Sequence, residues 1–270
     1  MKITEIKKSA KLNLAQKYPQ AVLASLIFTA LIIGLDLVKD ILLSLSNSPI
    51  LDILYRCAYF VLYMPLTYGL ISLFLDYTRN KAVKSTDFIN KSFQNFSKLW
   101  KLVLRIVLKL LIVFAICIVI SIIIITVLAH FIDISDANST QYQLLTAILI
   151  IATSIAIFIV FLPYSLCLYI FADDPDKPSK DILAESKELL NGNKTKLILL
   201  YLSFIGWIFL MCAIATGIYF LIGIFDVIAI VLQIETILFT PYLMISVATF
   251  YDDLKGDVQV VEAGKEKKKK

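Results

Sequence analysis

The sequence predicts an all-α polytopic membrane protein with six transmembrane helices, and three observations lead to this fold class. Hydrophobic residues make up 59% of the 270 residues and charged residues only 17%, whereas about a quarter of a soluble domain is charged. Six long runs lack Asp, Glu, Lys and Arg. No segment shows the alternating polarity, over about ten residues, that marks the strands of a membrane barrel. This composition excludes most soluble enzymes and argues against nucleic acid as a partner.

Each uncharged run is at or near the length of about 20 residues that a helix needs to cross the hydrocarbon layer. The first run follows a basic leader, as a signal peptide would, but it continues into Asp36, Lys39 and Asp40 without an obvious cleavage site. We therefore expect an uncleaved first span. The sixth run is short and extends to Val227 if Glu235 lies inside the span. The runs cover residues 18–35, 57–75, 110–132, 137–172, 197–225 and 236–251.

Basic residues predict the orientation of these spans. Most of the 26 lysines and arginines lie in the leader, in the connections after the second and fourth spans, and in the tail. The other connections carry only Lys39 and Arg56, and residues 130–142 carry none. Since Lys and Arg are retained on the cytoplasmic side of a membrane, both termini are expected in the cytoplasm. Residues 255–270, which end in KEKKKK, are expected to be a disordered basic tail, with lipid contact as its functional version.

Spans two, four and six share a spacing that composition does not explain. Each contains one proline in its apolar stretch and reaches an aspartate eleven residues later. Eleven residues are about three helical turns, so each proline and its aspartate lie on nearly the same face. Proline removes a hydrogen bond from a helix and usually kinks it. The three pairs are Pro65 with Asp76, Pro163 with Asp174, and Pro241 with Asp252.

These spacings predict three related units within one membrane domain, residues 1–270. The units cover about 1–78, 79–175 and 176–254, each with an interfacial amphipathic helix, an outgoing span and a returning span, inserted as parallel repeats. The alternative is that each proline is an independent kink. One apolar face is expected from Phe88, Ile89, Phe93, Phe96 and Trp100. A weaker match supports the repeat, since Ser85, Asp87 and Ser92 correspond to Ser179, Asp181 and Ser186, and residues 4–18 provide a more diverged copy.

The last third of the chain carries a family pattern. Its features are Ser186, the Asn191-Gly192 turn, the string LSFIGW that ends at Trp207, Gly217, and Pro241-Tyr242 leading to Phe250-Tyr251. With these features the chain resembles a bacterial family catalogued as domain of unknown function 975. The resemblance implies a six-span integral membrane protein in the cell membrane of Gram-positive-type bacteria, and it implies no reaction. The first unit has no comparable Gly-Trp signature.

Two charged residues within the apolar stretches predict an intramembrane polar site. Arg56 lies nine residues before Pro65, and Glu235 lies six residues before Pro241. The difference of three residues is about 4.5 Å of helix rise, so the two charges lie at similar depth and are able to pair in the outer half of the bundle. The alternative is that both reach the outer headgroups or form a structural bridge. The predicted site also includes Gln233, Tyr59, Tyr63 and Thr240.

Tyr55, Tyr59 and Tyr63 recur at every fourth residue, which places them on one stripe of the second span. They are expected either to line a polar path with Thr240, Tyr164, Tyr242 and Ser165 or to pack and anchor the span at the interface.

Charged residues near the cytoplasmic ends of the spans predict two further features. Asp76, Asp174 and Asp252 form an acidic cytoplasmic mouth if the units circle one axis, and such rings attract cations. Plain solvation at the membrane boundary is the alternative. Arg105 and Lys109 stand one turn apart at the start of the third span. We expect them to reach lipid headgroups, where anionic lipid attracts basic side chains.

Nothing in the sequence supports catalysis. The single histidine, His130, lies in an outer loop, and the four cysteines fall singly in separate spans. No glycine-rich phosphate loop is present, so ATP hydrolysis is not expected. The protein is therefore predicted to be no enzyme and to need no metal or cofactor.

Two functions remain open. The first is a small transporter, or an export or tolerance factor, for an amphipathic solute, lipid or peptide, suggested by parallel repeats and polar groups within the membrane. The second is a non-catalytic scaffold or accessory subunit that organises lipid or a membrane protein partner. Membrane lipids are expected partners in both.

Overall fold

The computed structural model of the chain is all-helical in the part that it describes, residues 1–45, 48–128, 140–223 and 226–256. Six helices in this part are long and apolar enough to cross a membrane, which confirms the predicted fold class. They cover Tyr18–Ser44, Pro49–Thr78, Phe96–Val127, Gln143–Asp173, Lys194–Ile222 and Ile228–Lys255. His130 and nearly all of the tail lie outside the described residues.

The chain divides into two compact units, which are described separately. Unit 1 combines Met1–Phe96 with Thr195–Lys270, and unit 2 is Ser97–Lys194. Unit 1 holds α1 (Ile3–Ala15), α2 (Tyr18–Leu45), α3 (Pro49–Thr78), α4 (Asp87–Gln94), most of α9 (Lys194–Leu202), α10 (Ile205–Ile222) and α11 (Asp226–Lys255). Unit 2 holds nearly all of α5 (Phe96–Leu128), then α6 (Thr140–Phe161), the 3-10 turn η1 (Leu162–Tyr164), α7 (Cys167–Asp173) and α8 (Ser179–Leu189).

The three prolines act differently on their helices. α3 continues through Pro65 and α11 continues through Pro241. At Pro163 the helix is interrupted, because α6 ends at Phe161 and α7 begins only at Cys167. Side-chain hydroxyl groups donate hydrogen bonds to the carbonyl oxygens at this interruption. Ser165 Oγ donates to Leu162 O at 2.8 Å, and Ser186 Oγ donates to Pro163 O at 2.7 Å. The loss of helical hydrogen bonds at a proline is thus offset by side chains.

The fifth predicted span is also interrupted. α9 ends at Leu202 and α10 begins at Ile205, where the sequence predicts one continuous span. Ser203 Oγ donates to Leu200 O at 2.6 Å, so a side-chain hydrogen bond satisfies a backbone carbonyl group at the end of α9. Phe204 at the break is buried.

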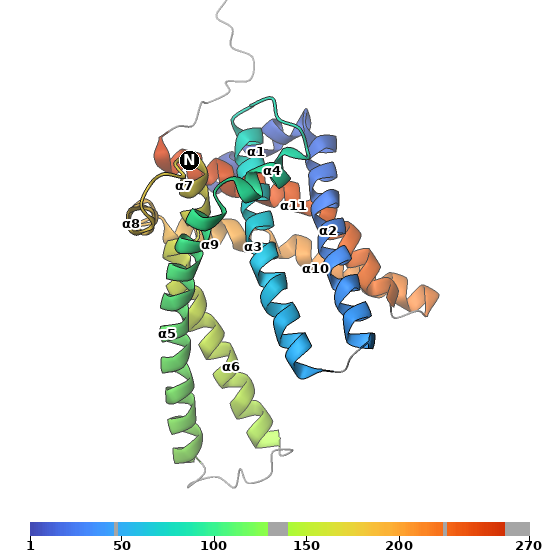
Figure 1. The fold of residues 1–270 in the computed structure, drawn as a ribbon, viewed down its shortest axis with the longest axis vertical. Coiled ribbons are helices and arrows are strands. Elements are labelled where there is room, and N and C mark those ends of the chain that lie inside the picture. Colours follow the sequence, from blue (N-terminus) through green and yellow to red (C-terminus); the bar gives the residue numbers. More distant parts are fainter. Residues whose placement is uncertain (46–47, 129–139, 224–225, 257–270) are drawn as a thin grey trace, which may run out of the picture. The chain divides into compact units, whose positions relative to one another are not determined.

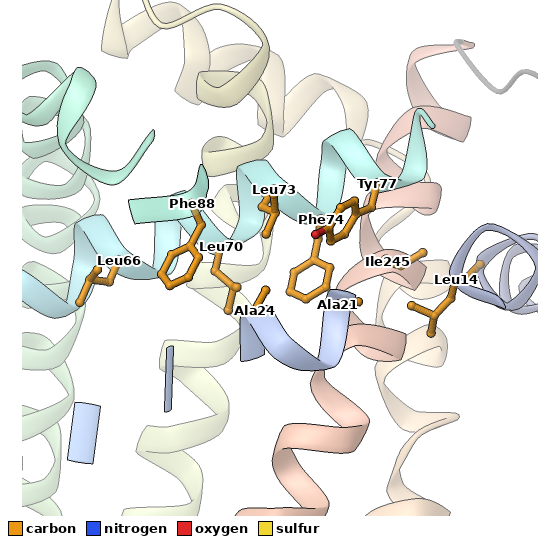
Figure 2. Close-up of a cluster of buried hydrophobic side chains, with 11 residues drawn as sticks. Leu14, Ala21, Ala24, Leu66, Leu70, Leu73, Phe74, Tyr77, Phe88 and Ile245 are labelled. Atoms are coloured by element: carbon orange, nitrogen blue, oxygen red, sulfur yellow. The ribbon is translucent and has the colours of Figure 1, made fainter. Parts of the chain in front are cut away.

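A cluster of buried apolar side chains forms the packed core of unit 1 (Figure 2). In α3 every buried residue falls in the second half, from Pro65 to Thr78, whereas Ile50 and Leu54 in the first half are largely exposed. The core brings α1, α2, α3, α4 and α11 together, and its members are Ala10, Leu14, Ala21, Ala24, Leu66, Leu70, Leu73, Phe74, Tyr77, Phe88 and Ile245. Many apolar side chains elsewhere on these helices remain exposed, as expected for surfaces that contact lipid.

In Figure 1, α10 and α11 run obliquely to α2 and α3. The three short helices that precede odd-numbered spans begin with the same turn. The backbone N–H of an acidic residue donates to the carbonyl three residues earlier, at 3.0, 3.1 and 2.9 Å. In two of these turns the acidic side chain also accepts from the backbone N–H at that earlier position, at 2.7 and 2.8 Å. The pairs are Glu5 with Lys2, Asp87 with Lys84, and Asp181 with Pro178, whose proline has no N–H to donate.

Each of these short helices also buries the same two positions, the residue after the acid and the residue four further on. All six residues are fully buried: Ile6 and Ala10, Phe88 and Ser92, Ile182 and Ser186. α4 packs on α3, α8 packs on η1 and α7, and α1 packs on α11. The expected apolar face of the second amphipathic segment is therefore divided, since Phe88 faces α3 while Phe93 and Phe96 are exposed.

The contact between α3 and α4 depends on Gly69. A Cβ at this position would lie 2.1 Å from Ser92 Oγ and 2.2 Å from Phe88 O. Both distances are far below a van der Waals contact, so only glycine allows α4 to approach so closely.

Replacement of Gly69 by alanine is expected to lower the free energy of unfolding by about 1–3 kcal/mol, because α4 has to move away from α3. The measurement is the thermal transition of the purified protein in detergent, followed by the loss of its monodisperse elution peak. Gly34→Ala is the matched control, since nothing lies within 4 Å of a Cβ at that helical glycine. An unchanged transition in Gly69→Ala would contradict the tight contact.

Candidate functional site

The structure does not join the two charges of the predicted intramembrane site. Arg56 Nε lies 2.8 Å from Asp52 Oδ2 on the same helix, and its side chain is 68% exposed. Glu235 lies on α11, where its Oε2 atom is buried without a hydrogen-bond partner among the described residues. The pairing considered from the sequence is thus replaced by a local pair at Arg56 and an unpartnered carboxylate oxygen at Glu235.

The tyrosine stripe joins α3 to α2. The ring centroids of Tyr55 and Tyr59 are 6.1 Å apart, and those of Tyr59 and Tyr63 are 5.7 Å apart in a stacked arrangement. Tyr55 Oη donates to Leu35 O at 2.8 Å, and the Tyr63 ring lies 6.1 Å from that of Phe28. Both of these partners belong to α2, so the contacts correspond to the packing role.

Gln233 and Thr240 lie on α11 near Glu235. Gln233 is exposed, and Thr240 Oγ1 donates to Thr236 O of its own helix at 2.7 Å. Neither residue lines the cavity into which Glu235 falls.

That cavity, called the unit 1 cavity here, has a volume of about 710 Å³. Four helices form it: α1 and α2 contribute Lys11 and Tyr18, α10 contributes Trp207 and Met211, and α11 contributes Glu235 and Phe239. Its lining is mainly apolar, with one carboxylate and one ammonium group. Ligand sites of this size typically combine apolar walls with a few polar groups that fix orientation.

Aromatic contacts hold the walls of the unit 1 cavity. Phe204, buried just before α10, lies edge-on to Phe239 and Tyr242 of α11, with centroids 5.4 Å apart in both pairs. Lys7 of α1 lies over the Phe204 ring at 4.4 Å, and its ammonium group donates to Ser203 O at 3.2 Å. Burial lowers the pKa of Lys7. These contacts fix α1 and the break between α9 and α10 against α11.

Glu235 lines the unit 1 cavity together with Lys11 of α1, whereas the sequence predicts that Glu235 lies in the outer half of the bundle, away from α1. Tyr18, the first residue of α2, also lines this cavity, and its hydroxyl donates to Leu238 O at 3.1 Å. Depth counted along each helix assumes that all helices run parallel, whereas α11 runs obliquely to α2 (Figure 1). Sequence reasoning missed Lys11, Tyr18 and Trp207 as cavity residues, because only the crossing of α1, α2, α10 and α11 brings them together.

The acidic residues at the ends of α3 and α11 are paired with basic side chains. Asp76 forms ion pairs with Lys81, at 2.8 Å, and with Lys91 of α4. Arg79 binds Asp252 through Nη2 at 2.7 Å and Nε at 3.2 Å, and Asp252 is only 5% exposed. These carboxylates link helices within unit 1 and are not open to water as a cation-attracting mouth requires.

Asp174, the third acid of the predicted mouth, lies in unit 2. Its Oδ1 accepts a hydrogen bond from the backbone N–H of Asp176 at 3.1 Å. Asp176 in turn pairs with Lys98, which lowers the pKa of that exposed carboxyl. Arg105 and Lys109 also lie in unit 2, where they line a separate cavity with residues of α8.

The described part of the chain contains no group of three or more His, Cys, Asp or Glu residues arranged to hold a metal ion. Cys57, Cys117, Cys167 and Cys212 are free thiols in the structure.

The arrangement of apolar spans, an amphipathic cavity and paired charges at the ends of the spans defines a helical membrane protein. Residues 1–257 match the family model described as Protein of unknown function (DUF975), and the chain belongs to this family. Neither the curated proteins nor the solved structures provide a match to the chain.

Replacement of Arg79 by glutamine is expected to lower the free energy of unfolding by about 1–3 kcal/mol, because it removes the positive charge that binds the buried Asp252 carboxylate. Arg56→Gln, the same change in an exposed pair within one helix, should alter stability by no more than about 0.5 kcal/mol. Thermal transitions of both variants in the same detergent measure the difference. Equal transition temperatures for the two variants would show that the Arg79–Asp252 pair contributes no more to stability than the exposed Arg56–Asp52 pair.

Proposed function

We propose that this protein is a small membrane transporter, or an export or tolerance factor, for amphipathic molecules that carry a cationic group. The observation that carries the proposal is the unpartnered Glu235 Oε2 atom in a cavity with mainly apolar walls. A carboxylate oxygen that is removed from water without a partner is unfavourable, and a ligand that donates a hydrogen bond from a positive group relieves this cost.

The charges of the unit 1 cavity favour a cationic amphiphile. Lys11 is exposed on α1, so its ammonium group reaches water. Glu235 Oε2 is buried and has no hydrogen-bond partner among the described residues, so a cationic group in the cavity is able to pair with it. The walls at Trp207, Leu210 and Leu238 are 45–50% exposed, which leaves an apolar surface for an alkyl or aromatic chain.

Three equivalent helix contacts support the internal repeat as part of this proposal. α1, α4 and α8 begin with the same turn and bury the same two positions. Each packs on the returning span of another repeat: α1 on α11, α4 on α3, and α8 on η1 and α7. The same contact at all three short helices is what three parallel repeats would make.

A non-catalytic scaffold is the second candidate, and the apolar surfaces of α5 and α6 in unit 2 favour it. None of the residues in the apolar windows of these two spans is buried within the described structure. Two bare apolar helices offer an interface to lipid or to another membrane protein. In this role the protein organises its partner and transports nothing.

Binding of a cationic amphiphile tests the first proposal. Trp207 lies in the unit 1 cavity, and the chain has two tryptophans, so Trp100→Phe leaves Trp207 as the single reporter. In this background dodecylammonium, whose N–H groups are able to donate a hydrogen bond to Glu235, is expected to change the fluorescence of Trp207. Glu235→Gln should weaken this binding about tenfold to a hundredfold, as for a lost hydrogen bond to a charged group.

The matched controls change either the ligand or the residue. An uncharged dodecyl amphiphile should bind Glu235→Gln and the parent protein equally, and Thr240→Val, which lies on α11 outside the cavity, should bind like the parent. Efflux from proteoliposomes then separates the two functions, because a transporter loses efflux with Glu235→Gln while remaining folded. Binding that is indifferent to Glu235 would reject the proposed ligand class.

Orientation in the bacterial cell membrane, with both termini in the cytoplasm, is part of the same proposal. In a variant without the four native cysteines, Ser48→Cys between α2 and α3 should react with a membrane-impermeant maleimide on intact cells. Asn191→Cys, between α8 and α9, should react only after permeabilisation. The reverse pattern would invert the topology.

A further inference from the structure

Unit 2 contains a basic cavity that the proposed transport function does not use. It has a volume of about 520 Å³ and lies between α5 and α8. No acidic residue lines it within the described chain. Its basic lining residues are Arg105 and Lys109 from α5, and Lys180 and Lys187 from α8.

The ammonium groups of Lys109 and Lys187 both lie close to the ring of Tyr164. Lys109 Nζ lies 4.9 Å from the centroid of the Tyr164 ring and 3.4 Å from its hydroxyl oxygen. Lys187 Nζ lies 5.3 Å from the same centroid. A tyrosine face attracts one cation, but two like charges from different helices at one ring repel each other. An anion between them would stabilise this arrangement.

Among the described residues, no ion pair neutralises the basic side chains that line this cavity. The salt bridges of unit 2 use other lysines: Lys98 pairs with Asp176, and Lys177 pairs with Glu185 at 2.5 Å. The pair with Glu185 raises the pKa of Lys177. Through this pair Glu185, the acid of α8 beside Ala184 in the cavity wall, is already engaged. No carboxylate in the described residues lies within ion-pairing distance of the four basic residues of the cavity.

The position of the basic cavity on α5 indicates what kind of anion it accepts. Arg105 and Lys109 are followed by an uncharged run that continues to the end of the span, and Leu108 and Ile112 line the same cavity. Lys109 is the last basic residue of the cavity along α5, and Ile112 and the rest of the span beyond it are uncharged. A free anion uses only the charged part, whereas a phospholipid places its phosphate among the basic groups and its acyl chains along the apolar side.

We propose that the basic cavity between α5 and α8 is a specific site for the phosphate group of an anionic phospholipid. The sequence predicts loose headgroup contact for Arg105 and Lys109 alone. The structure adds Lys180 and Lys187 of α8 as a second basic wall, and the Tyr164 ring lies beneath Lys109 and Lys187. The site uses no residue of the unit 1 cavity, so it stands or falls independently of the transport proposal.

Native mass spectrometry of the full-length protein in detergent tests this site. Phosphatidylglycerol and phosphatidylcholine with the same acyl chains compete for the protein, and the parent should retain phosphatidylglycerol preferentially. The double variant Lys109→Gln/Lys187→Gln should lose about tenfold or more of this preference, since each basic group near anionic lipid contributes several-fold to binding. Lys109→Arg/Lys187→Arg keeps the charge and should keep the preference.

Lys101→Gln is the matched control, because Lys101 lies one turn before Arg105 on α5 but does not line the cavity. The proposal is overturned if the double glutamine variant retains phosphatidylglycerol like the parent, or if Lys101→Gln loses the preference to the same extent. Displacement of the lipid by millimolar inorganic phosphate would also overturn it, by assigning the cavity to a free anion.

Discussion

The structure depends on the close packing of short amphipathic helices against the ends of the apolar spans. At Gly69 the backbone of α4 approaches α3 so closely that no side chain fits, and Phe88 and Ser92 are fully buried there. α8 makes the corresponding contact through Ser186, whose hydroxyl donates to the carbonyl of Pro163. Because lipid is as apolar as the exposed side chains of the spans, burying those side chains against one another adds little driving force for helix packing. Tight packing and hydrogen bonds at the ends of the spans therefore hold the helices in place.

Charged residues complete this packing. Asp252 is bound by Arg79 from the end of another span, and Asp76 is bound by Lys91 from α4. Such pairs cost free energy if one partner is lost, so they select one arrangement of the helix ends. The two cavities contrast with this pattern, because Glu235 Oε2 in unit 1 and the four basic residues in unit 2 lack partners of opposite charge among the described residues. Unbalanced charge beside apolar walls is what a binding site for an amphipathic molecule requires.

Much of the fold could be predicted from the sequence, but the candidate site could not. The six spans follow from hydropathy, since a helix in lipid satisfies its own backbone hydrogen bonds. From the sequence, the break at Pro163 looks like a simple kink and the break at Ser203 looks like continuous helix. Both breaks depend on side chains that donate hydrogen bonds to the carbonyl groups there, and these contacts are known only from the structure. Glu235 stood out as a charge in an apolar run, yet its distance from Lys11 depends on how α1 and α11 cross.

The sequence by itself determined the helical class, the number of spans, the spacing of proline and aspartate, and membership of the family. These properties depend on local hydrophobicity and helical period, which need no knowledge of neighbours. Only the tertiary structure decided that Asp76 and Asp252 are paired, that Arg56 turns to Asp52, and that Lys187 joins Lys109 at Tyr164. A charged side chain binds whichever partner the packing of helices brings within about 4 Å, and sequence separation does not fix that distance.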